Sequence, residues 1–253
     1  MKSSVVVLSL LSLLSFTNSC FAGFQGFDFE DNPSKPVGHA GALLIKKYPQ
    51  NHPDGAGEQA CLLVGHDKNL NNYAPPAGSV ESTLDIEIRD GATYYSSLKT
   101  IQREVLEETG GLVHLNDEVL KTLPMLYSSK FHDLLAVVRD DTFSCIALIH
   151  SVRNALADLN KSDAWKEMDD YNVLPVDNVI TVAQVMKTHF DNGGNINNLP
   201  ESILSPRKSN HFNTPLVYIN TRLGHRVEFC AYYMGAIADT LPQFQDILKD
   251  MGL

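Results

Sequence analysis

The chain lacks several patterns that would assign it to a common class of protein. Its 253 residues include four cysteines and one tryptophan, with no Cys-x-x-Cys pair, no His-Glu-x-x-His pattern and no Gly-x-Ser-x-Gly pattern. Zinc sites built on those spacings and serine hydrolases with a nucleophile elbow are therefore unsupported. Nine histidines are scattered along the chain, and isolated histidines are more often surface residues than ligands.

The chain also lacks positive charge. Lysine and arginine total 20 against 30 aspartates and glutamates, which gives a formal net charge of −10. No run of basic residues with interleaved aromatics offsets this balance locally. Because such a surface repels phosphate backbones and anionic membranes, polymeric nucleic acid is disfavoured as a partner. A small nucleotide diphosphate chelated by a metal ion is still compatible with this acidic surface.

Long hydrophobic runs are absent, and the one short run lies at the start of the chain. Met1-Lys2 precede the apolar segment Val5–Leu14, and Cys20-Phe21-Ala22 places small residues three positions and one position before a possible cleavage point. The pattern predicts a secretory signal peptide at residues 1–22 and a secreted or periplasmic mature protein. A membrane anchor fits less well because the run is too short for a stable membrane span. Lipidation of Cys20 is a weaker alternative.

Three cysteines follow that segment, namely Cys61, Cys145 and Cys230. An odd number allows at most one intramolecular disulfide in an oxidising compartment. Cys61 and Cys145 lie in apolar runs that resemble strands, which favours buried free thiols for both. The pairing stays open at this point.

The segment Arg103–Gly110 carries the clearest chemical signal. On a helix, Glu104, Glu107 and Glu108 stand three and four positions apart, so their side chains point the same way. Three close carboxylates repel one another unless a positive charge neutralises them, and a hard divalent cation such as Mg²⁺ or Mn²⁺ prefers oxygen ligands. Gly110-Gly111 can end the helix. Alternatively, this is only a solvated helix end.

The segment resembles the core of the Nudix box, whose pattern is G-x5-E-x7-R-E-U-x-E-E-x-G-U, with U an aliphatic residue. The matching residues are Arg103, Glu104, Val105, Glu107, Glu108 and Gly110. Upstream, Pro76–Glu81 resembles the family's entry into the box, with Gly78 at its first glycine. The apolar runs Ala42–Ile45 and Ala60–Val64 are similar to its first strands. The resemblance covers roughly residues 37–180.

The chain departs from the pattern in two ways. Gly78 and Arg103 are 25 positions apart where the pattern has 14, so about eleven extra residues interrupt the box within Ser82–Tyr94. Tyr95 stands where the box has its first glutamate, and Gly111 replaces the final aliphatic residue. Leu84–Arg89 alternates apolar and polar residues, which predicts an added edge strand.

The resemblance implies an α/β fold, namely an α/β/α sandwich with a mixed β-sheet. It implies one domain over residues 23–253, with a core at about 37–190 and a C-terminal extension at 191–253 that contains a hairpin and a helix. The implied activity is hydrolysis of a pyrophosphate bond in a nucleoside diphosphate linked to another group, with an ADP-ribose-like or dinucleoside substrate preferred. The oligomeric state stays open.

The resemblance also implies roles for individual residues. Mg²⁺ or Mn²⁺ would be held by Gly78, Glu104, Glu107 and Glu108, and the catalytic residues would be Glu107, Glu108 and Arg103, with Arg103 bracing the carboxylates. Tyr127 is a candidate to contact a base of the substrate. One extra carboxylate could come from a predicted acidic loop with Asp163, Glu167, Asp169 and Asp170. A secreted binding module without turnover and a structural, partner-binding protein remain alternatives.

Periodicity predicts the other elements. A helix begins near Ser96 and turns Leu98, Ile101, Val105 and Leu106 to the core, with Glu104 and Glu108 on the opposite edge. Expected strands are 134–138, 143–150, 215–220 and 226–233, and expected helices are 179–190 and 241–251.

Overall fold

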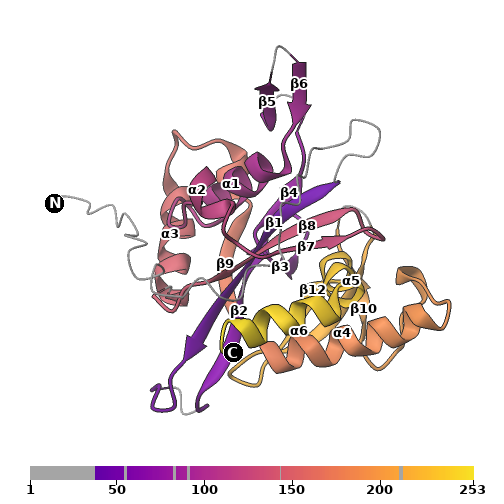
Figure 1. Cartoon of the computed structure of the whole chain (residues 1–253). Coiled ribbons are helices and arrows are strands. Elements are labelled where there is room, and N and C mark those ends of the chain that lie inside the picture. Colours follow the sequence, from indigo (N-terminus) through magenta and orange to yellow (C-terminus); the bar gives the residue numbers. More distant parts are fainter. Residues whose placement is uncertain (1–37, 54–55, 82–83, 90–91, 143, 211–212) are drawn as a thin grey trace.

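The structure is a computed structural model that describes residues 38–53, 56–81, 84–89, 92–142, 144–210 and 213–253 (Figure 1). The predicted signal peptide lies outside these residues. No helix within the described ranges combines the length and the apolar character needed to cross a bilayer. The strands are β1 (His39–Tyr48), β2 (Gln59–Asp67), β3 (Asn72–Ala74), β4 (Ala77–Ser79), β5 (Ile86–Arg89), β6 (Ala92–Tyr95), β7 (Met125–Ser128), β8 (Asp133–Arg139), β9 (Met168–Pro175), β10 (Leu204–Lys208), β11 (Pro215–Asn220) and β12 (Arg226–Cys230). The helices are α1 (Ser97–Glu108), α2 (Asp117–Leu120), α3 (Cys145–Ala157), α4 (Val176–Asp191), α5 (Ala231–Asp239) and α6 (Leu241–Asp250), with 3₁₀ turns η2 (Asp163–Lys166) and η3 (Ile196–Asn198).

A mixed sheet of ten strands forms the centre of the described part of the chain, which confirms the predicted α/β class. Its main path runs β10-β11-β12-β3-β2-β1-β8-β7. β1 pairs antiparallel with β2 and parallel with β8, and its first residues pair with β4. β9 pairs with β2 over Cys61–Asp67. This arrangement brings β4 beside β1 at one end of the sheet.

Helices cover both faces of the sheet, so the elements form three layers (Figure 1). Alternation along β1 explains the two cores, since successive side chains of a strand point to opposite faces. Leu43 and Ile45 pack in the core with α4, α5 and α6, whereas Ala42 and Leu44 pack in the core with α1 and α3. Strands buried on both faces read as continuous apolar runs.

The C-terminal extension joins the main sheet, because β12 pairs in parallel with β3 through Phe229 and Tyr73. The hairpin β11–β12 and helix α6 confirm two predicted elements. The prediction of a strand through Tyr233 was wrong, since β12 ends at Cys230 and α5 begins at Ala231. Burial of Ala231 and Met234, three positions apart, favours the helix over the strand propensity of the intervening tyrosines.

Two other predicted elements were also wrong. Residues 145–150 of the predicted strand 143–150 form the start of α3, and residue 143 lies outside the described residues. Leu148, Val152 and Ala155 are buried with helical spacing, and Ser144 accepts a hydrogen bond from the Ala147 N–H. The acidic residues do not share one loop, because Asp163 lies in η2 whereas Asp169 and Asp170 belong to β9. The predicted helix 179–190 is confirmed as α4, which begins at Val176.

The inserted segment forms a hairpin of its own. β5 and β6 pair with each other in a separate two-stranded sheet, so Ile86–Arg89 is not an edge strand of the main sheet as predicted. The Ser96 N–H donates to the Asp85 carbonyl oxygen at 2.7 Å, which holds the two ends of the hairpin together. The hairpin therefore projects from the start of α1 (Figure 1).

Candidate active site

Helix α1 places the three glutamates of the predicted site. Ser96 caps its start by accepting a hydrogen bond from the Lys99 N–H at 3.4 Å, as predicted. Gly110 and Gly111 follow its end with φ angles of 65° and 86°, and the Gly111 N–H donates to the Leu106 carbonyl oxygen at 2.7 Å. These left-handed residues end the helix directly after Glu108.

The prediction that Glu104 and Glu108 face away from the core was wrong. Their exposed fractions are 7% and 4%, and they share the buried stripe of α1 with Ile101 and Val105. The reason is that β4 packs against α1 and covers this edge of the helix. Glu107 lies at the border, with a side chain that is 14% exposed. Two of the three carboxylates are thus withdrawn from water.

β4 contacts both buried glutamates. The Ala77 N–H donates to Glu108 Oε2 at 2.8 Å. A Cβ atom added to Gly78 would lie 2.1 Å from Glu104 Oε1, far inside van der Waals contact. Glycine at position 78 therefore lets the Glu104 carboxylate lie directly against the backbone.

Arg103 is braced by Asp85, which sequence reasoning missed. Its Nε and Nη2 donate to the two Asp85 oxygens at 3.0 Å and 2.9 Å, which is bidentate pairing. Burial alone would raise the pKa of Asp85, but hydrogen bonds from Arg103, the Glu81 N–H and Thr100 hold it below its usual value. Asp85 lies seven positions after Gly78, one later than the box glutamate. The side chain of Tyr95 lies outside the described part of the structure.

The remaining nitrogen of the guanidinium group faces the carboxylates. Arg103 Nη1 lies 2.8 Å from Glu104 Oε1 and 3.4 Å from both Glu107 Oε2 and Glu81 Oε1. Arg103 therefore joins Asp85 on one side to the glutamates of α1 on the other. Arg103 thus acts as a brace between these groups, and its guanidinium group also supplies a positive charge to the cluster.

Arg103 alone does not balance the negative charge of the three helix glutamates. Burial raises the pKa of Glu104 to about 7, with Arg103 lowering it and Glu107 and Glu167 raising it further. Burial, together with Glu104, raises the pKa of Glu108 well above its usual value. The pKa of Glu107 is raised as well, mainly by burial. The acids thus destabilise one another when ionised.

Two further carboxylates belong to this environment. Glu167 immediately precedes β9, and burial together with Asp67 and Glu107 raises its pKa. Of the four acids considered from the sequence, it is the one that interacts with both Glu104 and Glu108, whereas Asp169 pairs with His66 at 2.7 Å. Asp67 was missed, because its role as acceptor for the Asn69 and Leu70 N–H groups gives only a turn signal.

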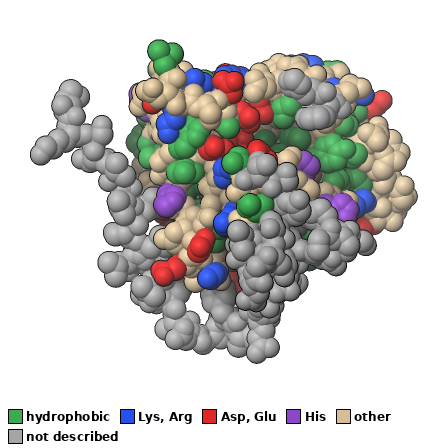
Figure 2. Space-filling view, turned by 90° about the horizontal axis from the view of Figure 1, so that it is seen from above, with side chains coloured by type: hydrophobic (Ala, Val, Ile, Leu, Met, Phe, Trp, Pro, Cys, Tyr) green, Lys and Arg blue, Asp and Glu red, His purple; other side chains and the backbone are tan. Residues whose placement is uncertain are grey.

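The cluster fits a hard divalent cation in chemistry, since all its donors are oxygens and carry excess negative charge. In the described residues, however, no three His, Cys, Asp or Glu side chains already stand in a metal-holding arrangement. Instead, Glu104 Oε1 lies 2.8 Å from Arg103 Nη1, and Glu108 Oε2 accepts the Ala77 N–H at 2.8 Å. Seen from above, acidic side chains gather near the middle of the face (Figure 2).

The other predicted residues lie apart from this cluster. Tyr127 is 37% exposed on β7, the last strand of the main path, and its contact with a substrate stays a prediction. Among the described residues, no disulfide joins Cys61, Cys145 and Cys230 to one another. Burial raises the pKa of Cys145 and of Cys230 to about 11, so neither is suited to act as a nucleophile at neutral pH.

The raised pKa values predict how stability depends on pH without metal. The folded protein holds the Glu104 proton up to about pH 7, whereas the unfolded chain releases it near pH 4.5. This contribution to stability is complete below pH 4.5 and is lost as the pH rises to about 7. We expect the melting temperature in EDTA to fall across that window and Glu104→Gln to flatten the fall. A flat wild-type profile would contradict the electrostatic account.

Comparisons with known proteins add no assignment, because no protein-family model and no curated protein matches the chain.

Proposed function

We propose that this protein is a divalent-metal-dependent hydrolase that cleaves the pyrophosphate bond of a nucleoside diphosphate linked to another group, as its resemblance to the Nudix family implies. The observation that carries the proposal is the cluster of Glu104, Glu107, Glu108 and Glu167, whose pKa values are all raised. Burying like charges costs stability, and strongly shifted pKa values cluster at functional sites.

Each residue has a role that follows from its position. Glu104 and Glu108 would be the inner ligands, with Glu167, at the end of η2, as a further ligand. A bound Mg²⁺ or Mn²⁺ ion would neutralise diphosphate oxygens and acidify a water molecule. Arg103, held by Asp85, would keep the glutamates oriented. Glu107, the most exposed of the three helix glutamates, would accept the proton of the attacking water, which its raised pKa favours.

The direct test is a substrate screen of the mature protein with Mg²⁺ or Mn²⁺. ADP-ribose, dinucleoside polyphosphates and nucleotide sugars are incubated with protein, and release of mononucleotide is measured. We expect turnover of at least one compound that depends on the metal and stops in EDTA. No release from any of them, with either metal, would remove the support for the hydrolase.

A second function is favoured by one observation. Arg103 Nη1 already lies 2.8 Å from Glu104 Oε1 and neutralises part of the cluster without metal. In a nucleotide-binding module without turnover, Arg103 would hold the carboxylates together in place of a catalytic metal ion. It would bind nucleoside diphosphates in the screen and release no product, with or without metal.

Gly78→Ala tests the contact between β4 and α1. The new Cβ would collide with the Glu104 carboxylate at 2.1 Å, so the carboxylate must move. We expect a loss of roughly 1–3 kcal/mol in the free energy of unfolding, typical of overpacking, and loss of metal-induced stabilisation. Gly38→Ala is the control, because its Cβ would meet ordinary contacts from 3.6 Å. Equal melting curves for the two variants would show that Glu104 is not fixed against Gly78.

A further inference from the structure

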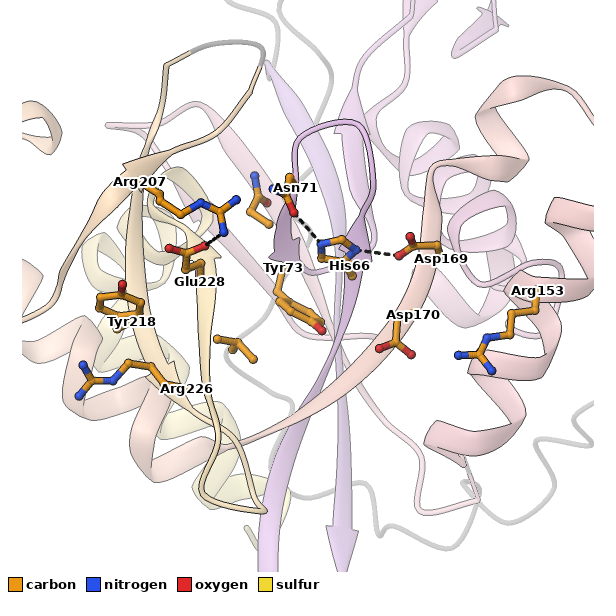
Figure 3. Close-up of a pocket in the computed structure, with 12 residues that line it drawn as sticks. His66, Asn71, Tyr73, Arg153, Asp169, Asp170, Arg207, Tyr218, Arg226 and Glu228 are labelled. Atoms are coloured by element: carbon orange, nitrogen blue, oxygen red, sulfur yellow. Dashed lines mark hydrogen bonds and ion pairs between the residues drawn. The ribbon is translucent and has the colours of Figure 1, made fainter.

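A groove of about 710 Å³ is lined by Asp169 and Asp170, two of the acids considered from the sequence, and by none of the residues of the carboxylate cluster. The hairpin strands β11 and β12 form one wall, with Arg207 of β10 beside them, and β9 and α3 form the other, with β2 and β3 between them (Figure 3). Tyr73 and His66 contribute ring surface in its middle, and their ring centroids are 5.1 Å apart. Part of the wall comes from the C-terminal extension, so the groove forms because β12 of that extension pairs with β3.

Two arginines at the groove have no carboxylate partner among the described residues. Arg207 is paired with Glu228 at 2.7 Å, so its charge is neutralised locally. Arg226 instead stacks on the ring of Tyr218 at 4.9 Å, and Arg153 stands exposed on α3 across the groove. Guanidinium groups without a carboxylate are well suited to hold phosphate oxygens.

The groove also contains a buried acceptor that lacks a donor. Asn72 is 1% exposed and lines the groove, and its Oδ1 has no hydrogen-bond partner within the described structure. An unpaired buried carbonyl oxygen is unfavourable, and a hydroxyl or amino group of a ligand would satisfy it. His66 beside it is fixed by Asp169 at 2.7 Å and Asn71 at 3.3 Å.

We propose that this groove binds a nucleoside monophosphate group. Arg153 and Arg226 would turn toward the phosphate from opposite walls, Tyr73 or Tyr218 would pack against the ring, and Asn72 would bond a ligand hydroxyl or amino group. The inference rests on the proposed function in one respect, since the group would be the nucleoside part of the substrate. His66 and Asp169 lie one and two residues from Asp67 and Glu167, so β2 and β9 link the groove to the carboxylate cluster.

Binding can be measured independently of hydrolysis. The four nucleoside 5′-monophosphates, inorganic phosphate and the uncharged nucleosides are titrated into the protein in EDTA, by calorimetry and by NMR. None of these probes contains a pyrophosphate bond. We expect at least one monophosphate to bind more tightly than both phosphate and its own nucleoside, and Glu108→Gln to retain this binding.

Variants locate the site. Arg153→Ala and Arg226→Ala should each weaken binding of that monophosphate by roughly 10-fold, as expected for loss of a charge-assisted hydrogen bond. Lys208→Ala is the control, because it removes an exposed positive charge from β10, next to Arg207, without lining the groove. Binding of phosphate alone with equal affinity, equal effects of all three variants, or no binding at millimolar concentration would each overturn the proposal. Binding without turnover would overturn only the proposed hydrolase.

Discussion

Replacing Glu108 by glutamine is expected to lower kcat by about 100-fold or more while making the metal-free protein more stable. Glutamine keeps the shape of the side chain, and its carbonyl oxygen can still accept the Ala77 N–H that bonds Glu108 Oε2 at 2.8 Å. It removes a charge that burial and Glu104 destabilise. The same charge would be needed to hold the cation that positions and acidifies water, which accounts for the size of the loss.

The two halves of this result need separate measurements. Steady-state kinetics with Mg²⁺ or Mn²⁺ give kcat, and thermal melting with EDTA or metal gives the metal-induced shift, which should nearly vanish in the variant. Glu118→Gln is the control, because Glu118 is an exposed acid on α2. If neither metal stabilises the wild type and both variants behave like it, the glutamates are only structural.

Asp85→Ala is expected to cost about 3–5 kcal/mol in the free energy of unfolding, the range for removing one partner of a buried ion pair. The Asp85 and Arg103 side chains are 1% and 14% exposed, so the guanidinium group would be left largely buried without its bidentate partner. Thr100 Oγ1, which donates to Asp85 Oδ2 at 2.9 Å, would also lose its acceptor. Chemical denaturation measures the change.

A second Arg–Asp pair in the same protein provides the matched control. Arg139 and Asp141 meet at 2.8 Å, but their side chains are 28% and 44% exposed. Asp141→Ala should therefore cost about 1 kcal/mol or less, because water and salt screen an exposed pair. A small loss for Asp85→Ala, similar to this control, would show that Arg103 does not depend on Asp85.

Sequence patterns predicted the helix of the site better than its surroundings. The spacing of Glu104, Glu107 and Glu108, the Ser96 cap and the glycines after Thr109 are local features, and the structure places them on one helix. Burial of Glu104 and Glu108 was not predictable, because it arises from β4, whose position depends on pairing with β1. Polarity alone directs a glutamate outward, and only tertiary packing reverses this.

Other features of the structure were not predicted from the sequence, for different reasons. Asp85 was hidden by an offset of one residue beside an insertion, although an acid shortly after Gly78 was a usable signal. In α3, the apolar start read as a strand because the helical period becomes visible only across Leu148, Val152 and Ala155. The groove combines β2 and β3 with a hairpin more than a hundred residues later, a pairing that no local pattern specifies.

The β5–β6 hairpin lengthens the sequence between Gly78 and Arg103 without moving the residues of the site apart. Its ends are held together by the hydrogen bond between Ser96 and Asp85, so the chain leaves the site and returns at nearly the same point. Residues added between the paired Arg89 and Ala92 would lengthen the hairpin and leave Arg103 and its carboxylates in place, at a small entropic cost. The position between Arg89 and Ala92 is thus suited to carry a peptide tag or a reporter domain. A sequence pattern with fixed residue spacing therefore depends on the length of that hairpin, although the arrangement of the charged groups at its base does not.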